Sequence, residues 1–202
     1  MIIGCIFSSQ RGQVSGVDDK GSAMGGKELI LWSIRIGLGC YAVSCYRFLQ
    51  RVSVDPVQQA NSSAIRGDRL WWSVAGLIFW IHFAAAFHFH HHWSHQHAFT
   101  HTAQRTGEML GWEFGYGVYF NYLFLLLWAV DVSWWWFSPV GYLQRRRWIS
   151  VSIQVFFLFV MINGAIVFVR GPTRWVSILA LCLLGILSRR RLLGKTEVSP
   201  AP

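Results

Sequence analysis

The sequence is poor in charge. Only 13% of its 202 residues are charged, whereas soluble domains carry roughly a quarter. Hydrophobic residues make up 53% of the chain and aromatic residues 16%. Tryptophans gather at the ends of long apolar runs, as in Trp71-Trp72 and Trp134-Trp135-Trp136. Because indole rings favour the membrane–water interface, this pattern predicts a membrane protein rather than a soluble domain.

The signatures of several enzyme classes are also missing. The four cysteines form no CxxC pair, which argues against a disulfide framework or a thiolate zinc site. No histidine begins an HExxH motif, so a zincin site is excluded, and there is no complete Walker motif or nucleophile elbow. The formal net charge of +9 comes from short basic clusters beside apolar segments, which favours contact with anionic lipid over nucleic acid.

Long apolar runs define the expected architecture. A spanning helix needs about 20 mostly apolar residues, and residues 29–49, 70–89, 115–137 and 148–169 meet that length. A fifth run, 172–188, is near the short limit. We therefore predict an all-α, polytopic helical membrane protein with about five transmembrane helices and an amphipathic, histidine-rich segment after the second.

The same pattern sets the domain organisation. Residues 29–191 are expected to form a single helical membrane domain, between disordered tails at 1–28 and 192–202. Met24, shortly before the first span, is an alternative start of the chain. The lipid bilayer is the expected partner, together with either a membrane-protein partner or a second copy of the chain.

The distribution of Lys and Arg predicts the orientation. With the loop containing Arg145, Arg146 and Arg147 inside, eleven basic residues lie on the inner side and six on the outer side. This arrangement predicts a multi-pass protein of the cell inner (cytoplasmic) membrane, with the N-terminus outside and the C-terminus inside.

Histidine is concentrated in one stretch. All eight histidines lie between residues 82 and 101, across the outer half of the second span and the start of the following loop. On an unbroken helix, His90, His97, His101 and Glu108 would share one face, and a second set would lie opposite. Histidines one turn apart can chelate one ion. The candidate metal ligands are His88, His90, His91, His92, His95, His97, His101 and Glu108.

Glu108 is a weaker candidate because it lies two turns beyond His101, about 10 Å along a straight helix. A break near Ser94 or Gly107 would change this geometry. Neutral imidazole suits Zn, Cu, Ni or Fe ions alike, so ligand type does not select the metal. The alternative to a metal site is a solvated, pH-responsive outer loop.

Polar residues inside the spans are costly in a membrane and indicate function or helix packing. Arg35, His82, Asn121 and Asn163 each lie about 9 to 10 Å from the outer end of their span, by the rise of a helix. Their common depth predicts a polar cavity beneath the histidine stretch, and an interhelical hydrogen bond is the simplest role for His82. Asp131 lies near the inner end of its span, where Arg145 or Arg146 could pair with it.

Two runs carry a resemblance to a known group. Residues 86–95 (AFHFHHHWSH) and 117–124 (GVYFNYLF), the latter followed by Asp131 and the Trp triplet, resemble motifs in small uncharacterised bacterial multi-pass membrane proteins with a His-rich motif. The resemblance covers about residues 70–175 and implies no activity. Membrane desaturases use several separated histidine boxes, whereas this chain has one block.

Four functions follow from these observations. The first is an integral membrane protein with a transition-metal-binding histidine cluster at the extracytoplasmic face. The second is a haem- or quinone-linked redox subunit, in which His82 or His88 and a histidine in 95–101 hold a haem. The third is a membrane enzyme that acts on a lipid-like or quinone substrate in the cavity, with a histidine as base. The fourth is a non-catalytic partner subunit of a membrane complex. No recognised catalytic motif points to an enzyme.

Overall fold

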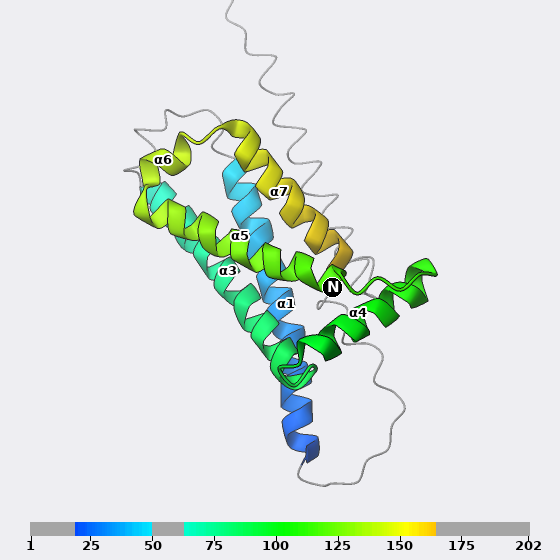
Figure 1. The fold of residues 1–202 in the computed structure, drawn as a ribbon. Helices are drawn as coiled ribbons and strands as arrows, with labels where there is room; N and C mark the ends of the chain where they lie inside the picture. The colour runs from blue at the N-terminus through cyan, green and yellow to red at the C-terminus, as the bar shows by residue number, and fades with distance from the viewer. Residues whose placement is uncertain (1–18, 50–62, 165–202) are drawn as a thin grey trace, which may run out of the picture.

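The computed structural model describes residues 19–49 and 63–164 of the chain (Figure 1). Within these ranges every regular element is a helix. The helices are α1 (Asp19–Leu49), α3 (Ser63–Phe89), α4 (His95–Leu110), α5 (Gly117–Phe137), α6 (Pro139–Leu143) and α7 (Arg147–Ile162). The predicted all-α class is confirmed.

Three of these helices are long and apolar enough to cross a membrane. They contain Gly25–Phe48 in α1, Ile65–Phe89 in α3 and Gly117–Phe137 in α5, which match the first three predicted spans. The fourth predicted span begins with α7, a shorter apolar helix. The fifth, at 172–188, and the predicted tail at 192–202 lie outside the described residues.

The helices extend past the apolar runs that predicted them. α1 begins at Asp19, inside the region expected to be a disordered tail, and α3 begins at Ser63. Hydrophobicity marks only the part of a helix that suits a bilayer, whereas backbone hydrogen bonding continues into polar residues. At these two N-terminal ends the helices therefore begin before the apolar runs 29–49 and 70–89.

α1 and α3 form an antiparallel pair, and α5 packs against α3 (Figure 1). α7 lies against α5, while α4 projects sideways from the end of α3. Gly76 allows the close approach of α3 and α5, because a Cβ atom there would lie 2.7 Å from Trp128 Nε1. The described helices therefore have two ends: the turn between α3 and α4, and the opposite end where α3 begins and α5 finishes.

Stacked aromatic rings make up the core between these ends. Trp72 of α3 stacks on Trp128 of α5 with 4.7 Å between ring centroids, and Trp128 stacks on Phe157 of α7 at 5.0 Å. The Trp128 indole donates to the Trp72 carbonyl oxygen at 3.2 Å. Burying large aromatic rings together with a satisfied indole N–H stabilises the packing of three helices.

A buried carboxylate fixes the opposite end. Asp131 accepts hydrogen bonds from Trp72 Nε1 and from the Tyr142 hydroxyl, each at 2.8 Å. It also forms an ion pair with Arg145 in which both side chains are almost fully buried. Of the two arginines considered from the sequence, Arg145 is the partner. Because the charge is paired and hydrogen-bonded, this network holds α3, α5 and α6 in one arrangement.

Candidate metal centre

A tight turn after α3 creates the site. The backbone N–H of His90 donates to Ala86 O at 3.0 Å, and that of Trp93 donates to Phe87 O at 2.9 Å. His92 and Trp93 then adopt φ angles of 49° and 58°. This left-handed conformation costs roughly 1–2 kcal/mol per residue for side chains other than glycine. The turn ends the helix and sends the chain into α4 in a new direction (Figure 1).

Ser94 starts α4 as its N-cap. The Ser94 side chain accepts a hydrogen bond from the backbone N–H of His97 at 3.2 Å. Serine at this position satisfies one of the amide donors that a first helical turn leaves open. The cap places His97 and, one turn later, His101 on the part of α4 that lies nearest the turn.

Four imidazoles meet between the turn and α4. Ring centroids lie 4.8 Å apart for His90 and His91, 5.2 Å for His91 and His97, and 4.8 Å for His90 and His101. The ligating atoms of His90, His91 and His97 all lie within 4.8 Å of one another. We call His90, His91, His97 and His101 the histidine cluster.

The histidine cluster contains both buried and solvent-exposed rings. His91 is 1% exposed, whereas His97 is exposed to solvent. Burial, followed by the charge of neighbouring imidazoles, lowers the pKa of His91 to about 3. Burial and the nearby His90 lower the pKa of His101 to about 4. These two rings are therefore neutral near pH 7, the state in which imidazole coordinates a metal ion.

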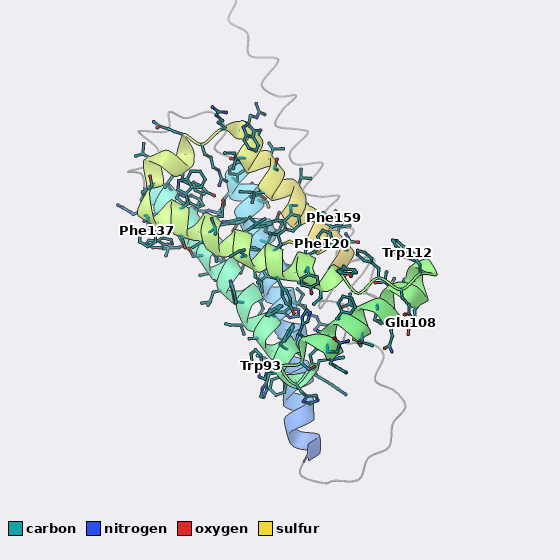
Figure 2. The ribbon with its side chains drawn as sticks, in the orientation of Figure 1. Trp93, Glu108, Trp112, Phe120, Phe137 and Phe159 are labelled. Carbon is teal, nitrogen blue, oxygen red and sulfur yellow. The ribbon has the colours of Figure 1, made fainter. Side chains whose placement is uncertain are left out.

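The other predicted ligands lie elsewhere. His88 accepts a hydrogen bond from Trp93 Nε1 at 3.1 Å, and His92 is exposed on the strained turn. His95 faces α5, with the Tyr122 hydroxyl 2.8 Å from its Nδ1 atom. Glu108 pairs with Arg105 at 3.0 Å. Figure 2 shows Glu108 far along α4 from Trp93 and the turn.

The turn after α3 explains why some of the predicted ligands meet in the histidine cluster and others do not. A continuous helix would have placed His91 between the two histidine faces, but the left-handed residues change the direction of α4 so that the His91 ring contacts His97.

The sequence analysis did not identify the tyrosines that contact His95. Their spacing could have indicated them, because Tyr119 and Tyr122 are three residues apart and share a face of α5. Both hydroxyls lie within hydrogen-bond distance of the His95 ring.

Of the four residues predicted to line a polar cavity, two lie together at one small cavity. His82 and Asn121 line a cavity of about 20 Å³, whose other walls are apolar. His82 Nδ1 lies 3.1 Å from the Ile30 carbonyl oxygen of α1, so His82 makes the expected interhelical contact. This volume suits about one water molecule.

Arg35 and Asn163 do not line this cavity. The Arg35 side chain is exposed, 5.2 Å from the centroid of the Trp32 ring. The Asn163 amide donates to Phe159 O of its own helix at 2.7 Å. These two side chains lie apart from His82 and Asn121 because equal depth along helices does not fix the direction in which each side chain points.

Comparison of the chain with protein-family models, curated proteins and solved structures finds no match. The resemblance to small bacterial multi-pass membrane proteins stays a prediction. What can be inferred about function therefore comes from the geometry of the histidine cluster and from the apolar helices that carry it.

Proposed function

We propose that this chain is an integral membrane protein that binds a transition-metal ion through His90, His91 and His97. The observation that carries the proposal is the approach of three imidazole ligand atoms to within 4.8 Å of one another. His101, whose ring packs against both His90 and His91, is the nearest candidate for a fourth ligand.

The spacing of the rings supports this role. Metal–nitrogen bonds of about 2.0–2.1 Å in a tetrahedral site place the nitrogens roughly 3.4 Å apart. His91 Nδ1 and His97 Nδ1 are already 3.1 Å apart. Small side-chain rotations of His90 and His97 would complete the site, whereas the strained turn holds the backbone in place.

The ligand set indicates which ions fit. The grouped ligands are imidazoles without a carboxylate or thiolate, judged over the described residues. Such a set suits Zn, Cu, Ni or Fe and disfavours Mg or Ca, which require oxygen ligands. The close packing of these imidazole rings also favours a single ion over haem, because a porphyrin would have to separate two rings on opposite faces.

The proposed role is binding and handling of metal at the outer face of the inner membrane, with the N-terminus outside. Charge supports this orientation: Arg47, Arg69 and Arg145 lie at the end opposite the histidine cluster. Basic residues concentrate on the cytoplasmic side of membrane proteins.

Metal analysis of the purified protein tests the binding role. We expect close to one ion per chain in the wild type and loss of that ion in His97→Ala. The matched control is His92→Asn, which removes an exposed imidazole nearby and keeps a residue that tolerates the left-handed conformation. A stoichiometric ion that survives His91→Ala and His97→Ala would overturn the proposed ligands.

Cysteine labelling tests the orientation. Gln104 is exposed on α4, so Gln104→Cys in a background without the native cysteines should react with a membrane-impermeant maleimide added to intact cells. Gln144→Cys, at the exposed C-cap of α6 in the loop predicted to lie inside, is the comparison and should be labelled only after the membrane is opened. Labelling of Gln104→Cys only after the membrane is opened would contradict the proposed outer location.

A further inference from the structure

The end of the molecule opposite the histidine cluster carries excess positive charge. Among the described residues, two carboxylates lie there, and both are paired: Asp68 with Arg47, and Asp131 with Arg145. Four further arginines at this end take no part in these two ion pairs: Arg66, Arg69, Arg146 and Arg147. A group with negative charge would be attracted to this end.

Arg69 is the best-defined member of this group. Its guanidinium carbon lies 4.0 Å from the centroid of the Trp136 ring. The Trp136 indole donates to Ser73 Oγ at 2.9 Å, and Ser73 Oγ–H donates back to Arg69 O at 2.8 Å. The aromatic surface under the guanidinium is therefore fixed by hydrogen bonds to the helix that carries Arg69.

The Arg69 guanidinium has an N–H donor that no described protein group accepts. Its Nε atom is buried and, over the part of the chain that the structure describes, has no hydrogen-bond partner. Arg66 precedes it by three residues and is exposed, so both side chains project from one side of α3. A guanidinium that lies 4.0 Å from an aromatic ring centroid can rest on the ring and still offer its other N–H groups to phosphate oxygens in pairs of hydrogen bonds.

We propose that Arg66 and Arg69, with Trp136 as the supporting ring, form a binding site for the phosphate of an anionic phospholipid headgroup. The surrounding aromatics favour a lipid over a free ion. Trp136 is 44% exposed and Trp148, next to Arg147, is 63% exposed. Exposed indoles of this kind lie at the headgroup level of a bilayer, where lipid phosphates are found. This site is independent of the proposed metal centre.

Thermal unfolding of the full chain in a neutral detergent tests the site. We expect phosphatidylglycerol to raise the unfolding midpoint more than phosphatidylcholine does. In Arg66→Gln/Arg69→Gln the apparent affinity for phosphatidylglycerol should fall at least about tenfold, because both charged donors to the phosphate are lost. The matched control is Lys27→Gln/Arg35→Gln, which removes two exposed charges from α1 and should keep the wild-type response.

Two further arms make the test decisive. Native mass spectrometry of the wild type with equal amounts of both lipids should show preferential retention of phosphatidylglycerol, and this arm does not require the variant to fold. Equal retention, or an equal loss of response in both double variants, would overturn the site. Stabilisation by inorganic phosphate at the same concentration, lost in the Arg66/Arg69 variant, would show a free-phosphate site and overturn the lipid assignment.

Discussion

His91 and His97 approach each other to 3.1 Å between their Nδ1 atoms, although one lies in a turn and the other on a helix. The contact exists because His92 and Trp93 turn the chain through left-handed conformations between them. The pair therefore links backbone strain to the candidate metal centre. Strained residues persist where the surrounding structure holds them, and they often occur at binding sites.

Replacing His101 should weaken metal binding without abolishing it. His101 is outside the group of three whose ligand atoms lie within 4.8 Å, although its ring packs 4.8 Å from that of His90. We expect His101→Gln to bind metal with lower affinity than the wild type but higher affinity than His97→Gln. Competition with a chelator of known affinity would rank the three proteins. Equal affinity in both variants would mean that the four imidazoles act as one ligand set.

The metal-free protein should lose stability in mild acid. Burial lowers the pKa of His91 to about 3 and that of His101 to about 4, from an ordinary value of about 6.5. Below pH of about 6.5 the unfolded chain therefore takes up protons that the folded protein does not, and unfolding becomes easier. The free energy of unfolding should fall as the pH drops from about 6.5 to about 4 because of both residues, and down to about 3 because of His91.

Chemical denaturation at several pH values would measure this loss. The double variant His91→Phe/His101→Phe removes both titrating groups and should show a shallower dependence over the same range. An unchanged slope in that variant would assign the acid sensitivity to other groups.

Relieving the turn should stabilise the protein. His92 adopts φ of 49°, and glycine accepts this conformation without the steric cost of a side chain. We expect His92→Gly to raise the free energy of unfolding by about 1 kcal/mol, with the metal content unchanged. Gly111 is the matched control because it has φ of 79° at the end of α4, so Gly111→Ala should destabilise the protein by about the same amount. A destabilised His92→Gly would show that the imidazole makes a stabilising contact.

Breaking the buried ion pair should be the most damaging of these changes. Asp131→Asn leaves Arg145 buried without its carboxylate partner, and loss of one member of such a pair costs about 3–5 kcal/mol. The control is Glu108→Gln, which breaks the more exposed pair with Arg105 and should cost less than about 1 kcal/mol. Unfolding midpoints of the two variants would separate these costs. Similar values would argue that Asp131 is not held by the buried network.

Much of the fold could be predicted because helices long and apolar enough to cross a bilayer produce long hydrophobic runs in a sequence. The apolar runs at 29–49, 70–89 and 115–137 each coincide with a helix suited to span a membrane. The amphipathic segment after the second run is also a helix, α4. The extensions of α1 and α3 were missed because their polar first turns carry no hydrophobic signal.

The sequence by itself determined the helical class, the apolar runs and the gathering of every histidine between residues 82 and 101. Only the tertiary structure decided which imidazoles meet, and it separated Arg35 and Asn163 from the cavity at His82. The physical reason is that a pattern of residues gives position along a helix. The direction of each side chain depends on the orientation of the neighbouring helices and on the turn at His92 and Trp93. The residue types at these two positions do not predict a left-handed backbone.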